Sequence, residues 1–142
     1  MTVTVDINVV LDVFLVRQPH FPASEAVLDL VSRHLVTGIF PSHGVSTFYY
    51  LLKRGRTHQD VLKDVDVLLA DFTIGPLNGS AWRAARTLNF SDLEDAAVAQ
   101  TAVESQSDWL ITRNTSDFRN SPVPAITPTE FLSRFFPVPV TS

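Results

Sequence analysis

Three groups of acidic and amide side chains follow short apolar segments or begin helical patterns in the sequence. They are Asp6, Asn8 and Asp12, then Asp92 and Asp95, then Asn114 and Asp117. Carboxylates that converge without lysine or histidine repel one another, and a bound Mg²⁺ or Mn²⁺ ion commonly neutralises that repulsion. Such ions can activate a water molecule and stabilise a phosphodiester oxygen during in-line hydrolysis. These residues therefore indicate metal-dependent phosphodiester hydrolysis, provided that the fold brings them together.

Asp95 is the most informative of these positions, because the pattern of its helix predicts which face is buried. The positions three, four, seven and eight residues later are Val98, Ala99, Ala102 and Val103. The face that contains Asp95 should therefore pack against a sheet, where an unpaired carboxylate is costly unless it has a partner or a metal. The small residues beside Asp95 would let this helix approach the strands closely. We therefore expect Asp95 to lie near Asp6.

Each acidic position also has an ordinary structural explanation. Asp92 could only favour the helix dipole, and Asp12 could be a polar residue on the first helix. The segment from Asn114 to Asp117 could be a turn after a strand. For Asp6 and Asp95 the alternative is a buried acid with hydrogen-bond partners. The whole set predicts a metal site more specifically than any one member does.

The composition is that of one globular domain. The chain has 142 residues, of which 45% are hydrophobic and 18% are charged, so it can bury a full core. Its formal net charge of −4 argues against nucleic-acid binding by bulk electrostatics, but not against an acidic metal-binding cleft. The lack of cysteine excludes disulfides and thiolate metal sites. No signal peptide or apolar run of about 18 residues is evident, so we expect a cytoplasmic protein with no membrane span.

The elements that must position these residues alternate between short strands and helices. Strands are predicted at residues 3–5, 39–40, 72–74, 109–112 and 125–126, and helices at 8–17, 23–36, 45–54, 58–69, 80–88, 92–106 and 128–135. This alternation predicts an α/β sandwich with a mainly parallel sheet, in which sites form beyond the carboxyl ends of the strands. We expect one domain over residues 1–142, with an apolar tail from about 136 to 142.

Local signals predict where several helices begin and end. Ser91-Asp92-Leu93-Glu94 has the form of a capping box with Ser91 at the N-cap, and Thr127 to Glu130 has the same form. Gly38 is expected to end the second helix. The four histidines, His20, His34, His43 and His58, show no ligand spacing and are expected to be solvent-facing or structural.

The order of these segments resembles the PIN domain (PilT N-terminal-like) family, most closely its short prokaryotic VapC-type toxins. The segments that carry the resemblance are residues 6–12 (DINVVLD), 45–52 (VSTFYYLL), 92–102 (DLEDAAVAQTA) and 111–118 (ITRNTSDF), and residues 126–132 (ITPTEFL) look like the family's ending. The resemblance covers nearly the whole chain. It implies a three-layer α/β/α fold and a Mg²⁺- or Mn²⁺-dependent ribonuclease.

The resemblance also implies roles for particular residues. The expected catalytic residues and metal ligands are Asp6, Asp92, Asp95 and Asp117. The residues expected to support the site are Asn8, Thr47 and Asn114. Arg113 is expected to contact substrate phosphates for a separate reason, its position beside the last acidic group. Thr47 stands where many relatives carry glutamate, and Asn114 stands where many have aspartate, so this site should hold its metals more weakly.

Two functions remain open from the sequence. The first is an endoribonuclease that cuts RNA as the toxin of a toxin–antitoxin pair, held inactive by a small antitoxin protein. The second is a catalytically weak PIN-like module that binds RNA or a protein partner, as the changes at Thr47 and Asn114 suggest. A homodimer is compatible with either function, and the apolar chain end could contribute to a subunit contact or dock loosely.

Overall fold

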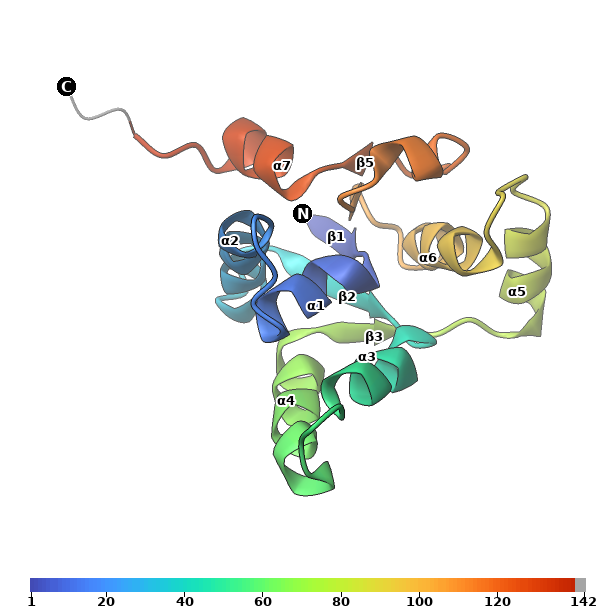
Figure 1. Ribbon diagram of the computed structural model, residues 1–142. Coiled ribbons are helices and arrows are strands. Elements are labelled where there is room, and N and C mark those ends of the chain that lie inside the picture. The colour runs from blue at the N-terminus through green and yellow to red at the C-terminus, as the bar shows by residue number, and fades with distance from the viewer. Residues whose placement is uncertain (140–142) are drawn as a thin grey trace.

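A sheet of five parallel strands forms the middle layer of the computed structural model, which describes residues 1–139 (Figure 1). The strands are β1 (Thr2–Val5), β2 (Thr37–Pro41), β3 (Thr73–Gly75), β4 (Trp109–Ile111) and β5 (Ala125–Ile126), in the order β3-β2-β1-β4-β5. Val3 of the central strand β1 is in register with Gly38 of β2 and Trp109 of β4. Because the strands are parallel, their carboxyl ends meet at one edge, and β1 ends in the middle of it.

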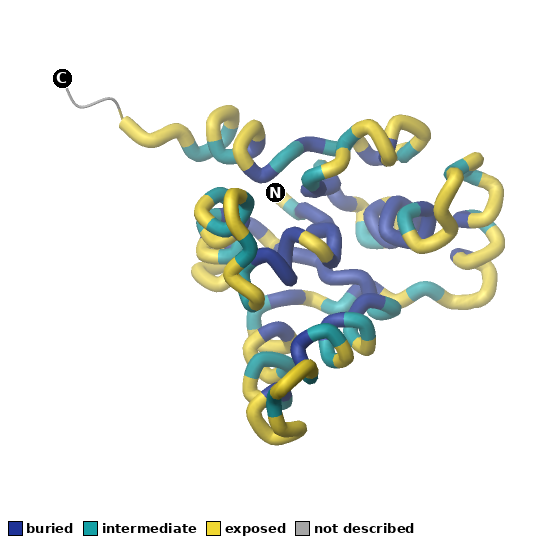
Figure 2. The backbone as a smooth tube through the Cα atoms, in the orientation of Figure 1, coloured by how far each residue is buried: buried dark blue, intermediate teal, exposed yellow. Residues whose placement is uncertain are grey.

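Helices cover both faces of the sheet, so the predicted α/β/α sandwich is confirmed. The helices are α1 (Ile7–Phe14), α2 (Phe21–Ser32), α3 (Gly44–Leu52), α4 (His58–Asp71), α5 (Gly79–Arg86), α6 (Leu93–Glu104) and α7 (Pro128–Phe135). One core cluster packs Val5 and Phe40 of the sheet against α1 to α4 and α7. A second cluster packs Leu110 against α6, and α5 lies outside α6 (Figure 1). Figure 2 shows that α6 is largely buried, whereas α4 and α5 are largely exposed.

Gly38 lies inside β2, so the expectation that it ends the second helix is wrong. Helix α2 ends at Ser32. A Cβ atom at Gly38 would lie 2.6 Å from Cγ1 of Val31 and 2.9 Å from a ring carbon of Phe72. Glycine is therefore required here because α2 packs closely onto the strand, which is a tertiary constraint that the local sequence does not reveal.

Helix α6 begins one residue later than the predicted capping box requires. Its N-cap is Asp92, whose Oδ1 accepts a 3.1 Å hydrogen bond from the backbone N–H of Asp95, so the assignment of Ser91 as the N-cap is wrong. The shift leaves Glu94 in the first turn, outside the cap. Thr127 is the N-cap of α7, as predicted, and accepts a hydrogen bond from the backbone N–H of Glu130.

Residues 136–139, which follow α7, form no helix or strand. The Phe136 ring packs against Phe131, with ring centroids 5.9 Å apart, and Val138 is 87% exposed. Residues 140–142 of the expected apolar tail lie outside the described residues. Between residues 1 and 139, no helix combines the length and apolarity that crossing a membrane requires.

Candidate active site

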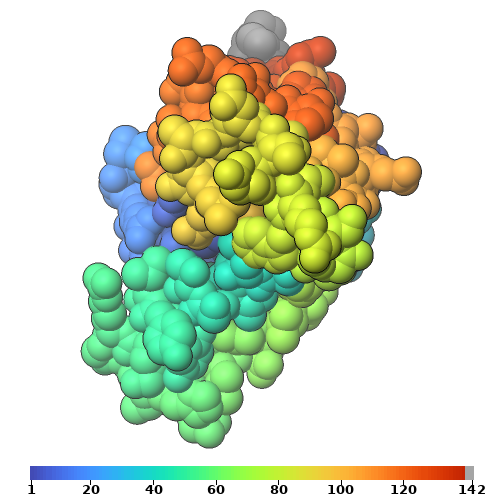
Figure 3. Space-filling model, turned by 90° about the vertical axis from the view of Figure 1, so that its right-hand side faces the viewer, coloured from blue at the N-terminus to red at the C-terminus, as the bar shows by residue number. Residues whose placement is uncertain are grey.

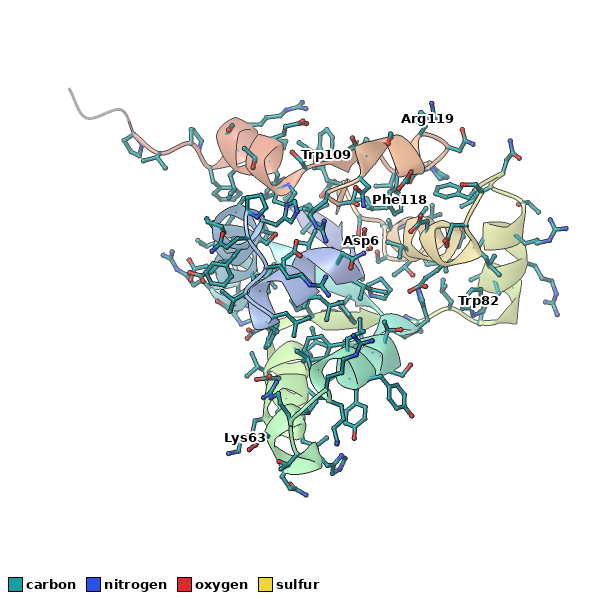
Figure 4. The ribbon with its side chains drawn as sticks, viewed as in Figure 1. Asp6, Lys63, Trp82, Trp109, Phe118 and Arg119 are labelled. Atoms are coloured by element: carbon teal, nitrogen blue, oxygen red, sulfur yellow. The ribbon has the colours of Figure 1, made fainter. Side chains whose placement is uncertain are left out.

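Asp6 lies at the carboxyl end of the central strand and at the start of α1 (Figure 4). Its backbone N–H donates a 2.9 Å hydrogen bond to the carbonyl of Ile111, and Oγ1 of Thr112 donates a 2.8 Å bond to its Oδ2. Burial raises the pKa of Asp6, while the Thr112 hydrogen bond and the nearby charge of Arg113 oppose that rise. The carboxylate is therefore held in one orientation by groups from the neighbouring strand and the residues that follow it.

A cavity of about 210 Å³ opens at this end of β1, between α1, α3 and the start of α6. Its polar lining consists of Asp6, Asn8, Thr47, Asp92, Glu94 and Asp95. Figure 3 shows the recess between α3 (green) and the beginning of α6 (gold), with the N-terminal segment (blue) at its base. We refer to it as the acidic cavity. It brings together the three acids predicted from β1 and α6, together with Asn8 and Thr47.

The carboxylates around the acidic cavity repel one another electrostatically, which adds to the effect of burial on the pKa of Asp95. Burial, followed by the charges of Asp92, Asp6, Asp117 and Glu94, raises the pKa of Asp95 to about 6. A set of oxygen donors under mutual repulsion suits a hard divalent cation, which relieves that repulsion. Among residues 1–139, no three acidic or histidine side chains lie close enough together to coordinate one ion. An ion would therefore have to draw these side chains closer together.

The last predicted acidic group follows β4 on a 3₁₀ helix, η1 (Thr115–Phe118). Asn114 and Asp117 are exposed and lie outside the lining of the acidic cavity, although the charge of Asp117 reaches Asp95. The backbone N–H of Asn114 donates a 3.2 Å hydrogen bond to Oγ1 of Thr112. Thr112 therefore connects this segment to Asp6, a role that the sequence did not reveal.

Arg113 has an internal partner in the structure. Its Nε lies 2.8 Å from Oδ2 of Asp12, which is fully buried, although the N–H is not aligned for a hydrogen bond. Nη1 of Arg17 lies 3.8 Å from the other oxygen of Asp12, and Nη1 of Arg113 lies 3.3 Å from Nε2 of His20. Asp12 is thus a buried partner of two arginines and lies outside the lining of the acidic cavity.

Besides Thr112, two more residues beside the predicted site were missed. Glu94 lies in the first turn of α6 and lines the acidic cavity, and the signal that could have found it is the run of acids from Asp92 to Asp95. His43 lies directly before α3, and both of its ring nitrogens are buried with no hydrogen-bond partner among residues 1–139. Burial lowers the pKa of His43, against an opposing effect of Glu94. No spacing in the sequence indicates this environment of His43.

The chain belongs to the PIN domain family, whose members are generally nucleases, because residues 2–116 match the family as a PIN domain. Its fold is similar to that of VapBC2 from Rickettsia felis, in a structure bound to a DNA fragment from the promoter. That match has 15% identity and a TM-score of 0.68, and it covers 89% of this chain and 98% of the other.

Two further solved structures share this fold. VapBC-1 from nontypeable Haemophilus influenzae has 12% identity and a TM-score of 0.65, with 91% of this chain and 99% of the other covered. FitAcB from Neisseria gonorrhoeae has 16% identity and a TM-score of 0.64, with 89% and 98% covered. A comparison with curated proteins found no match. The predicted family and fold are therefore confirmed.

Proposed function

We propose that this protein is a divalent-metal-dependent endoribonuclease that hydrolyses RNA phosphodiester bonds as the toxin of a toxin–antitoxin pair. The observation that carries the proposal is the convergence of Asp6, Asp92 and Asp95 on one cavity at the carboxyl edge of the sheet. Membership of the PIN domain family supports nuclease chemistry. The fold shared with the VapBC and FitAcB proteins supports the toxin role.

Mg²⁺ or Mn²⁺ fits this set of donors because hard divalent cations prefer oxygen ligands and the carboxylates among them repel one another. Asp6, Asp92 and Asp95 are the proposed ligands, and Asp117 adds negative charge close to Asp95. A bound ion would supply an activated water and would stabilise the charge on the reacting phosphate. The presence of Thr47 in the lining, in place of the expected glutamate, should weaken metal binding.

The protein's own side chains orient the proposed ligands and the substrate. The hydrogen bond from Thr112 fixes Asp6 before substrate arrives, which lowers the cost of orienting it during the reaction. Burial and the neighbouring carboxylates raise the pKa of Asp95 to about 6 in the metal-free protein, and the charge of a bound divalent ion would lower that pKa and favour the ionised carboxylate. Asn8 lines the same cavity with an amide that can donate a hydrogen bond to a phosphate oxygen.

A toxin of this type would require two macromolecular partners. RNA is the proposed substrate, and a small antitoxin protein is the proposed inhibitor, in keeping with the toxin–antitoxin systems that share the fold. Cellular RNA as the substrate also places the proposed site of action in the cytoplasm.

A second candidate function is a catalytically weak PIN-domain module that binds RNA or a protein partner. Two observations favour it. Thr47 lines the acidic cavity where the resemblance expects an acid, and the carboxylates described are not yet grouped around one point.

Cleavage of a structured RNA by the purified protein, with Mn²⁺ or Mg²⁺, separates these functions. We expect the wild type to cut, and Asp6→Asn and Asp95→Asn to lose most of that activity. Asp66→Asn on α4, outside the acidic cavity, is the matched control and should cut normally. Equal cutting by all four proteins would indicate a contaminating nuclease and would contradict the nuclease proposal. A rise in melting temperature with Mn²⁺, smaller in the two site variants, measures metal binding independently of cleavage.

A further inference from the structure

A second cavity, of about 300 Å³, adjoins the acidic cavity. It is lined by His43, Thr47, Trp82, Leu93 and Glu94. Thr47 and Glu94 also line the acidic cavity, so these two side chains stand between the two spaces. Apart from them, the lining of the second cavity is aromatic and aliphatic, and it contains no lysine or arginine. We call this space the aromatic cavity.

Trp82 gives the aromatic cavity a large flat wall. It extends from α5 toward the start of α3, where its ring meets that of His43 edge to face, with centroids 5.7 Å apart (Figure 4). Trp82 is 36% exposed, and Leu93 is 53% exposed, although both side chains are large and apolar. A partly exposed tryptophan ring beside a proposed nucleic-acid cleavage site is the kind of side chain on which unpaired bases stack.

His43 supplies polar groups that have no partner inside the protein. Both ring nitrogens are buried, and neither makes a hydrogen bond among the described residues. Buried polar atoms are nearly always paired, because an unpaired one loses its hydrogen bonds to water without replacement. A neutral histidine presents one donor and one acceptor, and the Thr47 hydroxyl can do either. The aromatic cavity therefore combines an aromatic side chain with the Thr47 hydroxyl, and His43 in its lining carries two unpaired ring nitrogens just below the accessible surface.

We propose that the aromatic cavity binds one nucleobase of single-stranded RNA, next to the phosphodiester bond that the acidic cavity would cut. The base stacks on Trp82, and its edge forms hydrogen bonds with His43 and Thr47. The carboxylate of Glu94 and the lack of basic side chains in the lining favour a neutral base over a phosphate group. The cavity is at the small end of the range of about 300 to 1,000 Å³ typical of ligand sites, which suits a single base. The inference rests on the proposed ribonuclease function, whose cleavage position it would specify.

Fluorescence of Trp82 can report on this site directly. The chain has two tryptophans, so Trp109→Phe leaves Trp82 as the only one. Asp95→Asn in the same protein prevents cleavage during the measurement. Titration with a short single-stranded oligoribonucleotide, without added metal, should change the Trp82 emission in a saturable way.

Affinity for the same RNA, labelled for fluorescence anisotropy, tests the contribution of each side chain in the Asp95→Asn background. Trp82→Ala should weaken binding by about 5- to 150-fold, the range found for loss of one base–aromatic stack. Trp82→Phe should recover much of that loss, and His43→Ala should change which base is preferred. Tyr50→Ala, which removes an aromatic side chain that is 70% exposed and outside both cavities, should bind as tightly as the parent. Circular dichroism checks that each variant is folded.

A single abasic nucleotide, moved along the oligoribonucleotide, distinguishes base binding from backbone binding. One position should lose as much affinity as Trp82→Ala, and the two losses should not add. Cleavage by the wild type combined with unchanged RNA affinity and cutting by Trp82→Ala would overturn the base site and leave the nuclease proposal intact. Saturable binding through Trp82 without any cleavage would contradict the nuclease proposal and leave the base site intact. Loss of affinity for a partner protein alone would show that the cavity docks protein, and would also overturn the proposal.

Discussion

The hydroxyl of Thr112 donates a 2.8 Å hydrogen bond to Oδ2 of Asp6, just beyond the point where β4 and β1 end side by side. Thr112 is fully buried, and its oxygen also accepts the backbone N–H of Asn114 at 3.2 Å. Burial alone would raise the pKa of Asp6 further, and this hydrogen bond works against it. Thr112 is therefore a positioning residue that keeps a buried carboxylate both oriented and easier to ionise.

Thr112→Val, which keeps the shape and removes the hydroxyl, should weaken Mn²⁺ binding by about tenfold and destabilise the fold by about 1 to 3 kcal/mol. Because the pKa of Asp6 would rise further, less of its carboxylate would be ionised at low pH. The loss of Mn²⁺ affinity should therefore be larger at pH 6 than at pH 8 in isothermal titration calorimetry. Thr112→Ser should restore most of it. Equal Mn²⁺ affinities in wild type and Thr112→Val would show that this bond has no role in the site.

Asp95 should make the metal-free protein less stable as pH rises. Its pKa is about 6 in the folded protein, against 3.8 ordinarily, so folding favours the protonated carboxyl. The stabilising contribution of that proton is complete below about pH 4 and is lost as pH rises through about 6. Asp95→Asn should therefore raise the free energy of unfolding at pH 7.5 by about 1 kcal/mol, a value reduced because water screens this partly open site.

Urea unfolding in EDTA at pH 4 and pH 7.5 measures this effect of Asp95. The difference between Asp95→Asn and wild type should shrink at the lower pH. Burial is the largest cause of the raised pKa, and the charges of Asp92, Asp6, Asp117 and Glu94 add to it. Mn²⁺ would offset those charges, so saturating Mn²⁺ at pH 7.5 should reduce or reverse the advantage of the variant. If Asp95→Asn were no more stable than wild type at pH 7.5, the ionised Asp95 carboxylate would not destabilise the metal-free fold.

The strands and helices could be predicted from the sequence because apolar periodicity is a local signal. The proximity of Asp6 and Asp95 could be predicted because Asp6 follows a predicted strand and small residues on α6 allow that helix to approach the sheet. Both acids line one cavity in the structure. The start of α6 was harder to predict, because Ser91 and Asp92 are both good N-caps and differ by one position. That single shift determined whether Glu94 was expected in the cap or at the site.

Long-range packing explains what the sequence could not predict. His43 meets Trp82 only because the fold brings a side chain of α5 to the residue before α3, and neither residue has a local pattern that indicates the other. Arg113 was expected to contact substrate because it follows a strand beside acidic residues. Its partner Asp12 lies far away in the sequence, on the first helix, so only the fold reveals the ion pair.

The pair of Asp12 and Arg113 should matter for stability more than for catalysis. Asp12 is fully buried, so Arg113→Ala would leave its carboxylate with Arg17, at 3.8 Å, as the one remaining ion-pair partner among residues 1–139. We expect Arg113→Ala to lower the free energy of unfolding by about 2 to 4 kcal/mol, and Arg17→Ala by less than about 1 kcal/mol. Asp12→Asn should recover part of the loss in the Arg113→Ala background, because a neutral amide costs less to bury.

A double-mutant cycle in urea measures the coupling between Asp12 and Arg113. Two outcomes together would support a substrate contact for Arg113 instead. They are a small loss of stability in Arg113→Ala and a clear loss of RNA affinity in the same variant.

Thr47 offers a gain-of-function test, because it lines the acidic cavity where the resemblance expects a glutamate. Thr47→Glu should tighten Mn²⁺ binding by about tenfold, since affinity for a hard cation rises with the number of charged oxygen ligands. The same change should lower the stability of the metal-free protein, because one more carboxylate would join a set that already raises the pKa of Asp95. Calorimetric titration with Mn²⁺ and urea unfolding in EDTA measure the two effects.

Ser46→Glu is the matched control for Thr47→Glu, because Ser46 is its exposed neighbour on α3 and lies outside both cavities. An equal gain from Ser46→Glu would mean that the added charge acts from a distance, and not as a ligand. Thr47 also lines the aromatic cavity, so Thr47→Glu should weaken oligoribonucleotide binding while it tightens metal binding. Opposite changes in the two affinities are expected only if one side chain faces both a metal and a base. Parallel changes would contradict the assignment of separate ligands to the two cavities.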